Sequence, residues 1–129
     1  MDKKTTQVLQ IELMLIETSA TVIEKNATES LKRIEKSVIN REEIYQLADF
    51  ILEKSKNIGT AITNILKLED VPEFIIKELK SANFLLHQIG ERVETIYPEE
   101  KEENFRIIIE DILSFAYKII QRVEPLIAK

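Results

Sequence analysis

The stretch that most constrains the fold is residues 8–23, VLQIELMLIETSATVI, because two neighbouring stripes of apolar residues run along it at helical spacing. Together the stripes cover about half of the helix circumference, whereas an ordinary surface helix has an apolar arc of roughly 100°. So wide a face needs neighbours on two sides, which predicts a packed bundle or a subunit interface. The first stripe consists of Leu9, Leu13, Ile16, Ala20 and Ile23, and the second of Val8, Ile11, Leu15 and Val22.

Apolar residues at alternating steps of three and four recur along the chain and predict four helices, near residues 5–39, 41–68, 72–97 and 99–126. Because the links between them are short, consecutive helices must run antiparallel. We therefore expect an all-α fold, an antiparallel up-down-up-down four-helix bundle with a long first helix, formed by residues 1–129 as a single helical-bundle domain. The expected core positions are Leu13, Ile16, Ile51, Ile58, Leu79, Leu86, Ile112 and Ile119.

Short motifs predict where the helices begin and end. Asn40 and Glu43 have the pattern of an N-cap residue and its partner three positions later. Asp70 comes shortly before Pro72, which predicts a second cap with proline in the first turn of the third helix. That helix should end near Pro98, because the residue before a proline is pushed out of the helical region.

The first predicted helix contains one candidate break, at residues 26–29. Asn-Ala-Thr-Glu at these positions has the pattern of a capping box, which could mark a kink or a new helix start. We favour a single helix through this point to about residue 39. Such a helix is longer than the other three, so one end should overhang the bundle or pair with something else.

Composition excludes several classes of protein. The chain has 129 residues, of which 44% are hydrophobic, so it is long and apolar enough to bury a core. It contains only 2 Gly and 3 Pro, too few for the turns of an all-β fold or a loop-rich enzyme. The absence of Cys excludes disulfides, a thiolate metal site and a Cys nucleophile, and it fits a reducing compartment.

Charge and hydropathy bear on partners and location. The net charge of −5 disfavours duplex nucleic acid as a partner, since phosphate binding relies on a basic surface. The apolar runs are far shorter than the roughly 20 residues of a membrane span, and Glu12 and Glu17 interrupt the place where a signal peptide would have its apolar core. We therefore expect a cytoplasmic protein with no membrane partner. The content of Ile, Lys and Glu is compatible with a thermophile, although an AT-rich genome would leave a similar composition.

The single histidine, His87, raises one alternative function. Histidine phosphotransfer domains present a lone His on one helix of a four-helix bundle, followed by a basic residue and a Gly at a spacing near His-x-Leu-Lys-Gly. The run here, His-Gln-Ile-Gly, has the Gly one place early and lacks the Lys. His87 falls outside the apolar stripe of its helix and should be exposed, as phosphotransfer requires. An ordinary surface or interface histidine is the favoured interpretation.

The sequence predicts no catalytic, metal or cofactor site. A di-metal site in a bundle needs Glu-x-x-His pairs that project inward, but the residue three before His87 is Phe84. The chain also lacks a Gly-rich phosphate loop, a Ser/His/Asp set and zinc-ligand spacing. Glu12, Ser19 and Ser55 interrupt the apolar stripes, and such polar groups set register or oligomeric state more often than they do chemistry. We therefore expect a protein that is not an enzyme and uses no cofactor.

A moderately basic stretch near the end of the first predicted helix is the candidate anion-binding set. Residues 91–111, by contrast, are acidic. The opposite signs could steer a partner or a second copy of the chain, but two solvated faces explain them more simply. No aromatic residues lie among the basic ones to stack single-stranded bases. The basic set consists of Lys25, Lys32, Arg33, Lys36 and Arg41.

The leading interpretation is a non-catalytic bundle that acts by protein–protein association, with a helical partner or with itself as a dimer. One apolar stripe of residues 8–23 is enough to close a four-helix core, so the second, from Val8 to Val22, is surplus unless neighbouring helices cover both. A phosphotransfer module that uses His87 and a weak nucleic-acid accessory protein that uses residues 25–41 are the alternatives.

Overall fold

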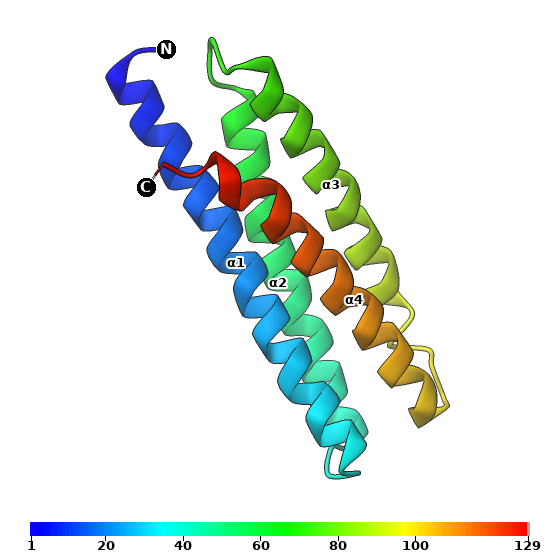
Figure 1. The fold of residues 1–129 in the computed structure, drawn as a ribbon. Helices are drawn as coiled ribbons and strands as arrows, with labels where there is room; N and C mark the ends of the chain where they lie inside the picture. The colour runs from blue at the N-terminus through cyan, green and yellow to red at the C-terminus, as the bar shows by residue number, and fades with distance from the viewer. Residues whose placement is uncertain (129) are drawn as a thin grey trace.

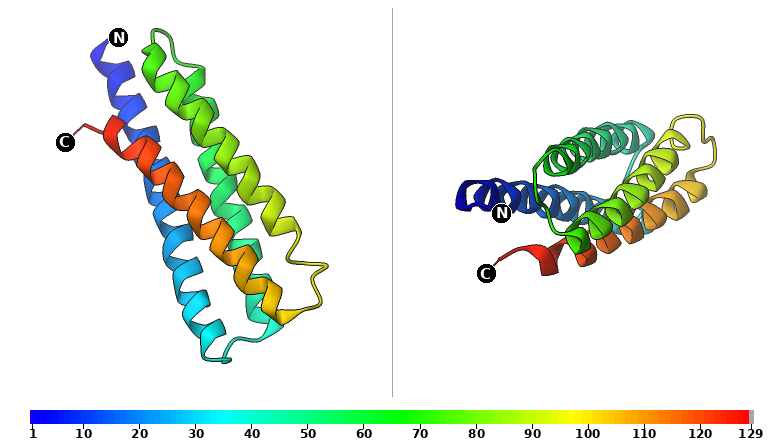
Figure 2. Two further views of the ribbon diagram at one scale, coloured as in Figure 1. Left: turned by 45° about the vertical axis from the view of Figure 1, so that its right-hand side comes forward. Right: turned by 90° about the horizontal axis from the view of Figure 1, so that it is seen from above.

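The computed structural model describes residues 1–128, and these form four long helices (Figure 1). Helix α1 spans Lys3–Glu35, α2 Arg41–Leu66, α3 Glu73–Glu94 and α4 Glu102–Val123, and the 3₁₀ turn η1 follows at Glu124–Leu126. Consecutive helices run antiparallel, as the views of Figure 2 also show. The predicted all-α fold, an antiparallel up-down-up-down four-helix bundle with a long first helix, is confirmed.

The helices surround one apolar core. Helix α1 packs against α2 and α4, while α3 packs against α2 and α4 from the diagonally opposite corner. All of the predicted core positions except Leu86 are fully buried. Burial of this apolar surface is the main force that holds the helices together, because single helices of this kind are marginal in water.

Leu86 is only half-buried, so its predicted place in the core is wrong. It lies where α3 approaches α2 at Gly59: a Cβ atom added to Gly59 would be 3.5 Å from Leu86 Cδ2. That distance is an ordinary van der Waals contact, so the packing of Leu86 does not require glycine at position 59. The heptad pattern of α3 includes Leu86, but the pattern does not show how far each position is from the bundle axis.

Helix α1 runs without a break through residues 26–29. Asn26 Nδ2 donates to the carbonyl oxygen of Val22 at 2.8 Å, and Thr28 Oγ1 donates to that of Glu24 at 2.8 Å. Both side chains bond to the preceding turn of their own helix, so neither caps a new one. The preference for a single helix is confirmed.

Helix α1 nevertheless ends four residues before the predicted residue 39. Ser37 has a φ of 56°, in the left-handed region. Its N–H donates to the carbonyl of Ile34 at 3.0 Å, and the N–H of Val38 donates to that of Arg33 at 3.0 Å. These two bonds form the Schellman arrangement that closes many helices, with serine at the position usually held by glycine.

Replacing Ser37 by glycine is expected to raise the free energy of unfolding by about 0.5–1 kcal/mol. A left-handed conformation costs a residue with a Cβ about 1–2 kcal/mol, and the greater chain entropy of glycine offsets part of that gain. Urea unfolding measures the change. The matched control, Ser30→Gly inside α1, should lower stability instead, and a Ser37→Gly variant less stable than the wild type would contradict the expectation.

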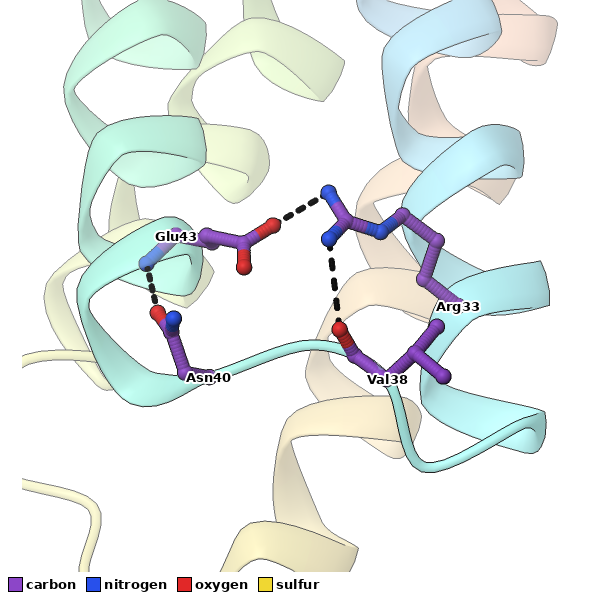
Figure 3. Close-up of polar contacts among 4 residues, drawn as sticks. All are labelled: Arg33, Val38, Asn40 and Glu43. Atoms are coloured by element: carbon purple, nitrogen blue, oxygen red, sulfur yellow. Dashed lines mark hydrogen bonds and ion pairs between the residues drawn. The ribbon is translucent and has the colours of Figure 1, made fainter.

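Helix α2 begins at the predicted cap (Figure 3). Asn40 is the N-cap residue, and its Oδ1 accepts a hydrogen bond from the backbone N–H of Glu43 at 2.9 Å. The carboxylate of Glu43 does not return to Asn40 but forms an ion pair with Arg33 of α1. Arg33 also donates to the carbonyl of Val38 at 3.2 Å, so one guanidinium joins the end of α1 to the start of α2.

The start of α3 differs from the prediction. Asp70 has a φ of 62°, which places it in the turn between helices. The N-cap position belongs to Pro72, no side chain caps the helix, and the first helical residue is Glu73. The predicted role of Asp70 as a cap is therefore wrong, and proline comes before the first turn rather than inside it.

The link between α3 and α4 is longer than predicted, because α3 ends at Glu94 and α4 begins at Glu102. Ile96, inside this link, is fully buried and fixes it to the core. The carboxylate of Glu99 accepts from the backbone N–H of Lys101 at 3.0 Å and from Asn104 Nδ2 at 3.1 Å. These two hydrogen bonds lower the pKa of Glu99. They also hold the start of α4 to a residue that precedes the helix.

The two ends of the chain meet on α1. In Figure 1 the first turns of α1 extend beyond the point where α4 ends but no further than the link between α2 and α3, so α1 overhangs α4 and not the whole bundle. The carbonyl of Leu126 accepts from Gln10 Nε2 at 3.3 Å, and the N–H of Ala128 donates to Gln10 Oε1 at 2.7 Å. The residues after α4 thus cross α1 at Gln10.

Candidate functional site

The first half of α1 presents an apolar face to solvent. Its side chains keep a large part of their surface exposed: 63% for Ile11, 54% for Met14, 43% for Leu15 and 37% for Val8. Val22, two turns beyond Leu15, is half-buried. We call these five residues the α1 apolar surface.

Packing separates the two stripes of residues 8–23. The first stripe, from Leu9 to Ile23, is buried against α2 and α4. The second lies on the α1 apolar surface, where the neighbouring helices of the same chain leave Val8, Ile11 and Leu15 exposed and cover Val22 only in part. Met14 was not part of the predicted set, although it could have been found from the sequence because it is three residues from Ile11 on a helix.

The α1 apolar surface is uncharged along its length and charged at its two ends. With 100° per residue, Lys4 lies roughly in line with Leu15 before the surface begins, and Glu29 lies roughly in line with Ile11 after it ends. Val8 and Val22 are both seven residues from Leu15. An antiparallel contact centred on Leu15 would therefore pair these two valines, whereas Ser19 and Ile16, the counterparts of Ile11 and Met14, are buried.

Polar groups that interrupt the core are only partly satisfied. Asn64 Nδ2 donates to Glu12 Oε1 at 3.5 Å, while Glu12 Oε2 is buried with no hydrogen-bond partner among residues 1–128. Ser55 Oγ is also buried without a partner in that range, and Ser19 is buried. Glu12 and Asn64 connect α1 to α2, which fits a role in helix register.

His87 is exposed on α3, where it borders a shallow hollow between α2 and α3. The other side chains around this hollow include Lys56, Asn64 and Lys67. Exposure meets one requirement of a phosphotransfer histidine. The helix that carries it has Gly90 one place earlier than the phosphotransfer motif and lacks the lysine of that motif.

Replacing His87 by alanine is expected to change the free energy of unfolding by less than about 0.5 kcal/mol and to leave self-association unchanged. The imidazole is exposed, and nothing in its surroundings depends on it. Urea unfolding and light scattering of the variant measure both quantities. Phosphate retained on His87 after incubation with a histidine kinase, and lost in the variant, would contradict the structural interpretation.

The five residues of the predicted anion-binding set do not act together. Lys25, Lys32 and Lys36 are exposed along α1, whereas Arg33 is held by Glu43 and by the carbonyl of Val38. Arg41 joins distant parts of the chain. Its guanidinium donates to the backbone carbonyls of residues 99 and 100 at 2.6 and 2.8 Å and lies 5.2 Å from the centre of the ring of residue 105.

Sequence reasoning missed the polar contacts that surround Arg41. Tyr45 stacks on Tyr97, with 5.9 Å between ring centres. The Tyr97 hydroxyl donates to Asp49 Oδ1 at 2.6 Å, and this hydrogen bond raises the pKa of Tyr97 to about 12. These residues fasten the link between α3 and α4 to α2. They are about 50 residues apart in the chain, so no local pattern could have predicted their contact.

The arrangement of possible metal ligands and the apolar character of the helices bear on metal binding and on membrane insertion. Over residues 1–128, no group of three or more His, Cys, Asp or Glu side chains is arranged to hold a metal ion. In the same part of the chain, no helix combines the length and the apolar character needed to cross a membrane.

Comparison with known proteins gives no family for this chain. No protein-family model, no curated protein and no solved structure matches it. The function is therefore inferred from the exposed surfaces of the molecule, and first from the α1 apolar surface, which contains the predicted self-association residues.

Proposed function

We propose that this protein acts by protein–protein association rather than by catalysis, and that it forms a homodimer through the α1 apolar surface. The observation that carries the proposal is the exposure of Ile11, Met14 and Leu15 on one face of α1. Monomeric proteins seldom leave a contiguous apolar patch in water, and such patches mark interaction sites.

A second copy of the chain is the occupant that we propose for this surface. If two α1 helices pair antiparallel about Leu15, Val8 of one copy faces Val22 of the other, and the two Leu15 side chains meet on the two-fold axis. Lys4 then lies opposite position 26, within one helical turn of Glu29. Position 26 lies between Lys25 and Glu29, so charges of both signs flank the contact, and its centre is apolar.

The mass of the wild-type protein in solution tests the proposal. Gel filtration with light scattering, over a range of concentrations up to about 100 μM, should show a dimer, since an interface worth roughly 8 kcal/mol dissociates near micromolar concentration. A protein that stays monomeric at about 100 μM contradicts the proposal. Its free energy of dimerisation would then be no more than about 4–6 kcal/mol, which is too little for a stable dimer.

The proposal includes two further statements, a cytoplasmic location and a thermophilic source. The absence of Cys supports a reducing compartment, and the content of Ile, Lys and Glu supports a heat-adapted protein. A helical partner protein is the alternative to a second copy of the chain as the occupant of the α1 apolar surface.

Two alternative functions have their own tests. A phosphotransfer role requires phosphorylation of His87 by a cognate kinase. A nucleic-acid accessory role requires salt-sensitive binding that is lost on charge reversal at Lys32 and Lys36. The engagement of Arg33 and Arg41 in structural contacts leaves fewer cations for the second role.

A further inference from the structure

A second exposed surface lies on α3 and α4, away from the α1 apolar surface. An open groove of about 1230 Å³ follows the seam between these two helices and reaches the residues after α4. Phe74, Lys77 and Phe84 line its α3 side, Lys118 lines its α4 side, and Leu85 and Leu126 form part of its floor. We call this feature the α3–α4 groove.

The α3–α4 groove holds two strongly exposed aromatic side chains. Phe74 is 64% exposed and Phe84 is 66% exposed, while Leu85 and Leu126 are partly buried against the core. The two phenyl rings start ten residues apart on α3, or about 15 Å along the helix axis. That distance is close to three turns of a helix laid along the groove. The exposure of these rings to water is unfavourable, and their burial against a partner would lower the free energy.

The α3–α4 groove carries an excess of positive charge. Lys77, Lys80, Lys118 and Arg122 line it, against one acidic residue, Glu78, so four positive charges and one negative give +3. Arg122 Nη1 lies 3.4 Å from Glu78 Oε2, which leaves the three lysines uncompensated. The whole chain carries −5. An apolar floor between basic edges is complementary to an amphipathic partner with acidic flanks.

We propose that the α3–α4 groove is a docking site for an acidic amphipathic helix of a partner protein. Such a helix lays apolar residues at positions i, i+3 or i+4, and i+7 into a groove of this kind. Its acidic side chains then lie near the lysines at the edges. Because the walls belong to α3 and α4, the proposal is independent of dimer formation through α1.

A helix suits the groove better than a nucleic acid does. Affinity for a polyanion grows with the number of phosphates neutralised, and three uncompensated lysines on an acidic protein supply few contacts. Phe74 and Phe84 are separated by the length of several nucleotides, so consecutive bases would find no continuous stacking platform. The aliphatic floor formed by Leu85 and Leu126 has its natural counterpart in leucine-like side chains.

Nuclear magnetic resonance can detect even weak docking. The ¹⁵N-labelled full chain is titrated with a synthetic 18-residue peptide of Leu and Glu in an amphipathic helical order. Saturable shifts are expected for residues 74–88 and 115–126, and they should weaken as salt is raised. Two controls are a peptide of the same composition in scrambled order and one with Lys in place of Glu, and neither should produce these shifts.

Variants locate the binding to the groove. Phe84→Ala and the double variant K77E/K80E should each weaken binding of the acidic peptide at least tenfold. The matched controls, Ile107→Ala and Lys56→Glu, change exposed residues outside the groove and should leave binding unchanged. Circular dichroism of each variant checks that it is folded, and Phe84→Leu replaces any Phe84→Ala protein that is not.

Several outcomes would overturn the proposal. One is the absence of shifts with the acidic peptide at millimolar concentration, and another is equal binding of the scrambled peptide. Unchanged affinity in both Phe84→Ala and K77E/K80E would place the peptide elsewhere. Tighter binding of a 12-nucleotide oligothymidylate to the same residues would identify the surface as a nucleic-acid site instead.

Discussion

Replacing Ile112 by alanine should lower the free energy of unfolding by about 2–5 kcal/mol, because the change removes a fully buried side chain and leaves a cavity. Ile112 lies on α4, which packs against both α1 and α3. A void at this position reduces contacts with two neighbouring helices. Total stability of a domain is only about 5–15 kcal/mol, so the loss is a large fraction of it.

Urea unfolding, followed by circular dichroism at 222 nm, measures the effect of Ile112→Ala. The matched control is Ile107→Ala on the same helix, where the side chain is 49% exposed and the expected loss is below about 0.5 kcal/mol. Both substitutions change helix propensity equally, so the difference between them reports burial. Equal effects at the two positions would mean that the core is not where the helix pattern predicts it.

The fold was predictable because apolar residues recur regularly at helical spacing in each of the four helices. Ile51, Ile58, Ile112 and Ile119 follow steps of three and four, and each is fully buried. The helix ends were less predictable, because backbone conformation and distant contacts decide them. Ser37 adopts a left-handed backbone conformation. The presence of a serine in a sequence does not indicate that conformation.

The link between α3 and α4 illustrates the effect of distant contacts. Its length depends on the burial of Ile96 and on the hydrogen bond from Tyr97 to Asp49 of α2. Arg41 holds the same link through backbone carbonyls 58 and 59 residues away. Local patterns predict caps such as Asn40, but they contain no information about which distant segment an arginine or a tyrosine will reach.

The candidate surfaces were predictable only in part. A helical pattern gives the angle between two stripes on α1, but it does not say which stripe the neighbouring helices cover. The structure supplies that choice: Leu13 is buried and Ile11 is exposed. Phe74 and Phe84 had a signal in the sequence, since both fall outside the apolar seam of their helix. Their significance depends on the lysines of α3 and α4 that lie around them.

Changing Ile11 and Leu15 together to lysine should convert the proposed dimer into a folded monomer. The two Leu15 positions meet on the proposed two-fold axis, so the variant would place like charges against each other and bury them unpaired. We expect the dissociation constant to rise at least 100-fold, which corresponds to about 2.7 kcal/mol. The monomer itself should stay folded, because both side chains already face solvent.

Light scattering gives the mass of the double variant, and circular dichroism gives its helix content. The matched control, Ile107→Lys with Tyr117→Lys, adds the same charge at two apolar residues of α4 that are 49% and 52% exposed. This control should remain a dimer, since it leaves α1 unchanged. A control that also becomes monomeric would show that net charge, and not the α1 apolar surface, governs association. An Ile11→Lys, Leu15→Lys protein that unfolds would contradict the exposed position of these residues, and one that stays dimeric would place the interface on another face.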